Sequence, residues 1–170
     1  MSSAPDPGGN ESHAFEQLLE VGIALSSTRD LNALLSQILS EARRFTTADA
    51  ATLYLVQGSH LRAELAQCQT FIDRWGPDKA AKVFRTFTVP ISMKSIAGAA
   101  AETRQVVNIP DVQALDEASP FRYNAAYDKA YDYSTHSNLA VPMLTREGQA
   151  IGVLQLINAR RGSQICAFGE

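Results

Sequence analysis

The segment from Leu139 to Asn158, LAVPMLTREGQAIGVLQLIN, limits the choice of fold more than any other part of the chain. It holds two long apolar runs joined by a polar turn at residues 145–148, a pattern that predicts a β-hairpin. Nearly every position is apolar on both faces, which is typical of central strands covered on both sides. Gln155 is the exception in the second run, and it is either a residue at a wet sheet margin or a polar group directed into a ligand cavity.

The composition indicates one globular domain and excludes several classes of partner. The 170 residues are 45% hydrophobic and 19% charged, as in an ordinary domain with its own core. A formal net charge of −3 gives no electrostatic basis for binding nucleic acid or an anionic membrane. No apolar run approaches the roughly 20 residues of a membrane span, and the N-terminal residues do not form a signal peptide. We therefore expect a cytoplasmic protein.

The sequence carries no recognisable catalytic or metal-binding motif. Cys68 and Cys166 are far apart and form no metal or redox pattern, so both are expected to be reduced thiols. Walker, Gly-x-Ser-x-Gly and His-Glu-x-x-His motifs are all missing from the sequence. We predict no catalytic residues and no metal site.

The N-terminal part is predicted to be helical after a disordered start. Residues 1–12 are rich in Pro, Gly and Ser and are expected to be disordered, which places the domain at 13–170. A first helix is expected over residues 13–25, and a second from the N-cap Asp30 to about Thr46. The second helix has an apolar stripe at helical spacing, made of Leu31, Leu34, Leu35, Ile38, Leu39, Ala42 and Phe45.

The rest of the chain alternates between hairpins and short helices. Strands are expected at residues 50–57, 61–67, 86–91 and 106–109, and at 139–158 as two strands around the turn at 145–148. Helical segments are expected at residues 80–84, at 96–103 with Ser95 as N-cap, and from Pro120 to about Lys129. Because regular βαβ repeats are missing, the order predicts an α+β fold with a mostly antiparallel sheet and helices on both faces.

Four segments together resemble the GAF domain family. They are ADAATLYLV (48–56), SIAGAAAETRQVVNIPDV (95–112), STHSNLAVPM (134–143) and EGQAIGVLQLINA (147–159). The resemblance implies a GAF-like six-stranded antiparallel sheet, with the terminal helices on one face and a small-molecule pocket on the other. It also implies that the family's C-terminal helix is lacking here. The chain is most similar to GAF domains that precede bacterial HD-type phosphohydrolases, cyclases and histidine kinases, and to those of cyclic-nucleotide phosphodiesterases.

The same resemblance implies a ligand site under a lid formed by residues 112–137. The start of the helix after Ser95 corresponds to a phosphate site, although any helix start exposes such N–H groups. The chain has Tyr131-Asp132 where the cyclic-nucleotide subgroup has Thr-Gly, and Asn158-Ala159 where that subgroup has Asn-Lys. The implied ligand-binding residues are Ile96 and Ala97 at the helix start, Asp128, Tyr131 and Thr135 on the lid, and Thr52, Gln67 and Gln155 on the sheet.

The sequence thus predicts a non-catalytic sensory domain of a bacterial signalling protein. It would bind a small effector under the lid and relay binding to an output domain, as a homodimer joined through its terminal helices. The alternative is a structural dimerisation module with a vestigial pocket. Cyclic-nucleotide-specific binding and a thiol enzyme acting through Cys68 are further alternatives. No cofactor is expected, and neither haem on His136 nor a bilin on Cys68 is predicted.

Overall fold

The computed structural model describes residues 31–83 and 87–169. The chain forms two compact units, Met1–Gln37 and Ile38–Glu170, and the second contains the sheet. Residues 31–46 are helical, as the apolar stripe predicts. The expected disordered segment at 1–12 and the expected helix at 13–25 lie outside the described residues.

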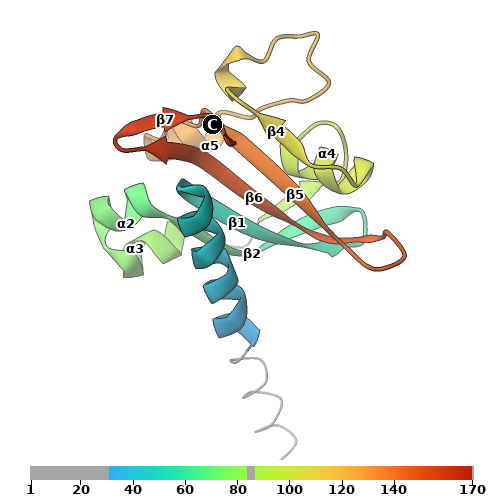
Figure 1. Cartoon of the computed structure of the whole chain (residues 1–170), viewed down its shortest axis with the longest axis horizontal. Helices are drawn as coiled ribbons and strands as arrows, with labels where there is room; N and C mark the ends of the chain where they lie inside the picture. The colour runs from blue at the N-terminus through green and yellow to red at the C-terminus, as the bar shows by residue number, and fades with distance from the viewer. Residues whose placement is uncertain (1–30, 84–86, 170) are drawn as a thin grey trace, which may run out of the picture. The chain divides into compact units, whose positions relative to one another are not determined.

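The second unit is built on an antiparallel sheet (Figure 1). Six strands follow the order β3-β2-β1-β6-β5-β4, and a short seventh strand, β7, pairs with the end of β6. The six-stranded antiparallel sheet that the resemblance implies is confirmed. The strands are β1 (Ala48–Gln57), β2 (His60–Cys68), β3 (Thr88–Pro90), β4 (Val107–Ile109), β5 (Asn138–Leu144), β6 (Ala150–Arg161) and β7 (Gln164–Cys166).

The predicted hairpin forms the centre of this sheet. β6 lies between β1 and β5, and Val153 and Leu156, whose side chains point to opposite faces, are both fully buried. Because proline cannot donate to a ladder, Pro142 in this hairpin favours a bulge or an unpaired position. Pro142 instead stands directly opposite Val153, and the register shifts one residue later, between Met143 and Leu144.

In the described part of the chain, four α-helices and one 3-10 helix connect the strands. The Ser95 cap is confirmed, since Ser95 Oγ accepts a 3.0 Å hydrogen bond from Gly98 N. The helix expected from Pro120 begins only at Ala126, and one helix before Gly76 was not anticipated. The helices are α2 (Gln69–Trp75), α3 (Pro77–Val83), α4 (Ile96–Thr103), η1 (Val112–Ala114) and α5 (Ala126–Tyr131).

Helices cover both faces of the sheet, as predicted. α4 packs on one face, where its alanines meet Tyr54, Leu61 and Val153. On the other face, Ser40 and Arg43 of the 31–46 helix hydrogen-bond to Gln67 of β2. The burial of the neighbouring Leu39, at 1% exposed, is consistent with a packed helix there.

Candidate functional site

A cavity of about 640 Å³ lies between the sheet and the segment that contains α5. Its floor is formed by alternate residues of the central strands, including Thr52 and Tyr54 of β1 and Gln155 of β6. Thr52 stands directly opposite Gln155 in the ladder, so the two side chains share one face. Seven of the eight residues predicted as ligand-binding line this cavity: Thr52, Ile96, Ala97, Asp128, Tyr131, Thr135 and Gln155.

Gln67 is the predicted site residue that does not reach the cavity. Its side chain bonds to Ser40 and Arg43 on the opposite face of the sheet. The cause is a β-bulge, because Leu53 pairs with Leu65 whereas Tyr54 pairs with Ala63, which leaves Glu64 as an extra residue. The extra residue reverses the alternation of β2, so Ala66 and Cys68 share the face of Thr52 and Gln67 does not.

Asp128 stabilises the lid through hydrogen bonds to another lid residue, Thr135. This carboxylate is only 7% exposed and accepts hydrogen bonds from Thr135 N at 2.6 Å and from Thr135 Oγ1 at 2.9 Å. Burial, with the neighbouring Asp128, raises the pKa of the Tyr123 hydroxyl, which also lines the cavity. Two of the predicted ligand residues, Asp128 and Thr135, therefore bind each other.

Aromatic rings form one wall of the cavity. Phe71 of α2 is fully buried and contacts the rings of Tyr127, Tyr131 and Tyr133 at centroid distances of 6.4, 6.0 and 5.4 Å. Trp75 stacks on Phe71 at 4.8 Å. Phe71 and the three tyrosines line the cavity on one side and do not fill it.

The floor of the cavity carries a chain of buried polar groups. Tyr54 Oη donates to Gln155 Oε1 at 3.1 Å, and Gln155 Nε2 donates to Asn138 Oδ1 at 3.0 Å. Burial raises the pKa of Tyr54, so this hydroxyl stays protonated. Gln155 is 9% exposed, which favours the second interpretation of this residue, a polar group directed into a cavity.

The start of α4 adds positive potential to the lining. Ile96 and Ala97 lie in the first turn of this helix, where the backbone dipole favours an anion. The cationic side chains of Lys94 and Arg122 line the cavity as well. The lining as a whole can accept a ligand with an apolar or aromatic body and polar or anionic groups.

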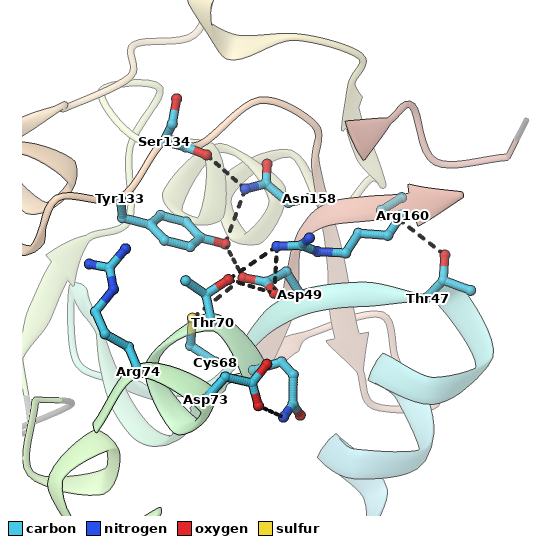
Figure 2. A network of polar contacts seen from close by, with 12 residues as sticks. Thr47, Asp49, Cys68, Thr70, Asp73, Arg74, Tyr133, Ser134, Asn158 and Arg160 are labelled. Atoms are coloured by element: carbon cyan, nitrogen blue, oxygen red, sulfur yellow. Dashed lines mark hydrogen bonds and ion pairs between the residues drawn. The ribbon is translucent and has the colours of Figure 1, made fainter. Parts of the chain in front are cut away.

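Behind the aromatic wall, Asp49 is the centre of a polar network (Figure 2). This carboxylate is 3% exposed and accepts from Tyr133 Oη at 2.8 Å, Thr70 Oγ1 at 2.9 Å and Arg160 Nη2 at 3.0 Å. Cys68 Sγ donates to it at 3.5 Å. Five donors and acceptors from distant parts of the chain therefore converge where β1 begins.

Asn158 connects this network to the end of the lid. Its Nδ2 donates to Tyr133 Oη at 3.1 Å and to the carbonyl oxygen of Ser134 at 2.8 Å, and its Oδ1 accepts from His136 N at 2.7 Å. Asn158 adopts a left-handed conformation with φ of 57°, which asparagine tolerates better than most residues. The side chain therefore replaces backbone partners that a regular strand would supply.

Sequence reasoning did not find several residues of these two regions. Asn138, Lys94 and Arg122 line the cavity without having been predicted, and Asp49 was quoted only within a family segment. A polar residue at the start of an apolar strand was a usable signal for Asn138. No local signal pointed to Asp49, because its partners come from four other segments.

The side chains considered for cofactor or thiol chemistry have structural partners. Burial raises the pKa of Cys68 to about 12, and the thiol is 1% exposed. His136 lies between Asp111 Oδ1 and Ser134 Oγ, each 3.2 Å from a ring nitrogen. Among the described residues, no group of three or more His, Cys, Asp or Glu side chains could hold a metal ion.

The structure is thus an α+β domain with a lid-covered cavity on one face of an antiparallel sheet. The sequence matches the GAF domain family over residues 30–169. The chain belongs to this family, whose members are typically regulatory or sensory modules. Within the described residues, no helix has the length and apolar character needed to cross a bilayer.

Curated relatives include insect phosphodiesterases. The chain is 29% identical over 154 residues to the cGMP-specific 3',5'-cyclic phosphodiesterase of Drosophila mojavensis, an alignment that covers 86% of this chain and 13% of that protein. The corresponding protein of Drosophila melanogaster has the same identity and coverage. The chain thus spans about an eighth of the length of these relatives.

Solved structures with this fold come from several kinds of protein. The GAF domain region of a putative membrane protein from Geobacter sulfurreducens has a TM-score of 0.59 and 14% identity, covering 86% of this chain and 85% of that one. A GAF domain/HD domain protein from the same organism has a TM-score of 0.56 and 16% identity, covering 80% and 79%. Free methionine-R-sulfoxide reductase from Neisseria meningitidis has a TM-score of 0.52 and 19% identity, covering 78% and 65%.

Proposed function

We propose that this GAF domain is a non-catalytic sensor of a signalling protein, which binds a small effector between the sheet and the 112–137 lid. The observation that carries this proposal is the 640 Å³ cavity beneath α5. Its buried polar groups, Gln155, Asn138 and Asp128, occupy fixed positions around an aromatic wall, as in sites that orient a ligand.

Ligand binding would act by stabilising one arrangement of the lid. The lid consists of a short helix and connecting loops, so a ligand that fits one arrangement of it better can shift its position. Tyr133 contacts both the cavity and Asp49, which gives ligand-induced lid movement a path to the start of β1. We propose that an output domain elsewhere in the full-length cytoplasmic protein receives this change.

The relatives suggest one class of effector to test first. Several are named cGMP-specific phosphodiesterases, so purine cyclic nucleotides belong in any ligand panel. The chain differs from that subgroup at Tyr131-Asp132 and at Ala159. We therefore do not restrict the proposed effector to a cyclic nucleotide.

A non-catalytic role is supported by the surroundings of Cys68. One structural neighbour is a free methionine-R-sulfoxide reductase, which raises the possibility of thiol chemistry. The Cys68 thiol is buried and protonated, whereas a nucleophilic thiol is exposed and ionised. Turnover of free methionine sulfoxide can be compared in wild type and Cys68→Ser. If the variant is as active as the wild type, Cys68 is not a catalytic nucleophile.

Ligand binding is tested first by native mass spectrometry of the purified protein, followed by thermal shift with a panel of purine nucleotides and cyclic nucleotides. A retained mass or a raised melting temperature supports the sensor.

The matched variants that test the site are Gln155→Leu, in the cavity, and Gln67→Leu, on the opposite face. We expect only Gln155→Leu to weaken binding, by about tenfold for a lost buried hydrogen bond. Equal affinities in both variants would contradict this site.

Dimerisation is the second candidate function, favoured by the exposed apolar side chains of the 31–46 helix. Phe45 is 87% exposed and Ile38 is 48% exposed, and their spacing of seven places them on one side of the helix. Two copies of this chain could bury such a stripe against each other, with or without a functional pocket. Sedimentation at increasing concentration tests this candidate, since Phe45→Glu should shift a dimer toward monomer and leave the cavity unchanged.

A further inference from the structure

A second cleft, of about 800 Å³, lies where β1 begins and β6 ends. Its lining comes from the C-terminal half of the 31–46 helix, from residues 47–49, from α2 and from Arg160. It shares no residue with the lid-covered cavity. We propose that this cleft is a separate binding site for a phosphate-type anion. The proposal is independent of the effector cavity.

Positive side chains dominate the lining of this cleft. Four arginines, Arg43, Arg44, Arg74 and Arg160, come from three different elements. Two carboxylates, Asp49 and Asp73, oppose them, which leaves an excess of two positive charges in the lining. The remaining lining residues are polar except for Ala48, and they include hydroxyl groups on Ser40, Thr47 and Thr70.

The two carboxylates already have donors. Asp49 binds Arg160, Thr70 and Tyr133, and it is almost completely buried, so its charge is compensated within the protein. Asp73 accepts a 2.8 Å hydrogen bond from the side-chain amide of Gln69. Neither acid forms a salt bridge with Arg43.

Arg43 is the cation that most needs an anion. Its Nη1 donates to Gln67 Oε1 at 3.2 Å and its Nη2 donates to Gln69 Oε1 at 3.3 Å, and both acceptors are neutral. In the described part of the chain, Arg43 forms no salt bridge. A guanidinium held in place by neutral amides keeps its full charge and its planar geometry, which suits two oxygens of a phosphate group.

The other acids near the cleft compete only weakly with a bound anion for its arginines. Glu41 pairs with Arg44 at 2.7 Å, but both side chains are more than half exposed. Asp132 lies 3.9 Å from Arg74 and is fully exposed. Exposed pairs of this kind contribute little to stability, so a multivalent anion in the cleft can replace them at small cost.

Isothermal titration calorimetry of the full chain with inorganic phosphate and with pyrophosphate, in a buffer of low ionic strength, tests the proposal. We expect saturable binding at one site, stronger for pyrophosphate because it carries more charge. Arg43→Gln should weaken binding about tenfold or more, as expected for a charge-assisted pair. Arg43→Lys should lose less, since it keeps the charge without the planar fork.

Arg146→Gln is the matched control, because it removes the same charge from an exposed turn remote from the cleft. Equal weakening by Arg43→Gln and Arg146→Gln would show a general charge effect and overturn the proposal, as would binding that never saturates. Should Arg43→Gln lower the melting temperature, Arg44→Gln tests the same cleft with an exposed side chain. Loss of phosphate binding in Gln155→Leu would place the anion in the lid-covered cavity instead.

Discussion

The hydroxyl group of Tyr133 donates a 2.8 Å hydrogen bond to the buried carboxylate of Asp49. The ring of the same tyrosine lines the lid-covered cavity and packs on Phe71 at a centroid distance of 5.4 Å. One side chain therefore contacts both the candidate ligand site and the polar network at the start of β1. Any ligand that displaces Tyr133 must also remove a donor from a carboxylate that is only 3% exposed.

Replacing Tyr133 by phenylalanine tests the value of this contact. The ring stays, but Asp49 loses a donor and Asn158 loses an acceptor. A hydrogen bond to a charged group contributes about 1.5–3 kcal/mol, so the free energy of unfolding should fall by that amount. Urea denaturation measures the change.

Tyr131→Phe is the control for that experiment, since its ring packs on the same Phe71. The donors to Asp49 come instead from Tyr133, Thr70, Arg160 and Cys68. Equal losses of stability in the two variants would mean that the hydroxyl of Tyr133 contributes no specific stabilisation.

Asp128 is predicted to control how often the lid opens. Asp128→Ala removes the acceptor for both Thr135 N and Thr135 Oγ1, and it leaves a buried amide without its partner. Hydrogen exchange across residues 121–137 should become about tenfold faster or more, because local opening loses this penalty.

Glu117→Ala is the comparison for Asp128→Ala, because it removes an exposed carboxylate from the same segment. Exchange rates in α4 should stay unchanged in both variants. Acceleration spread evenly over the whole sheet would indicate global destabilisation and contradict a local role for Asp128.

The sequence was sufficient for the fold because the strands of this sheet are encoded locally. The apolar runs of β1, β5 and β6 and the capping serine of α4 need only neighbouring residues to be recognised. α2 was missed since its seven residues are too few to show a helical stripe, and it is positioned by Phe71 and Thr70 contacts with distant segments.

The site was predicted less completely, and Gln67 shows why. Regular alternation from Leu61 places Gln67 on the same face as Leu61 and Ala63, which is the cavity face. A single extra residue at Glu64 reverses that assignment, and no turn residue or glycine marks the bulge in the sequence. Long-range pairs such as Asp49 with Arg160 have no sequence signal, because the two residues are far apart in the chain and no local pattern links them.

Two glycines are predicted to be required for different reasons. A Cβ on Gly152 would collide with the backbone oxygen of Tyr54 in the neighbouring strand, whereas Gly148 has open space but a φ of 79°. Gly152→Ala should cost about 1–3 kcal/mol through overpacking, and Gly148→Ala about 1 kcal/mol through backbone strain. Asparagine, which tolerates positive φ, should restore stability at 148 and not at 152. Thermal melts of the Ala and Asn variants at positions 148 and 152 test this prediction. If Asn restores stability at both positions, the neighbouring strand must move enough to avoid the collision at Gly152.

Stability is predicted to fall in alkali through the Cys68 thiol. Burial raises the pKa of Cys68 from 9.0 to about 12. Between these values the unfolded chain loses the thiol proton while the folded chain keeps it, so the free energy of unfolding decreases as pH rises, by up to about 1.4 kcal/mol per pH unit. The stabilisation is fully present below pH 9.

Chemical denaturation between about pH 8 and pH 10, before most tyrosines ionise, isolates this effect when wild type is compared with Cys68→Ala. Parallel slopes in the two proteins would show that the thiol titrates alike in the folded and unfolded chains, and would reopen the case for a reactive Cys68.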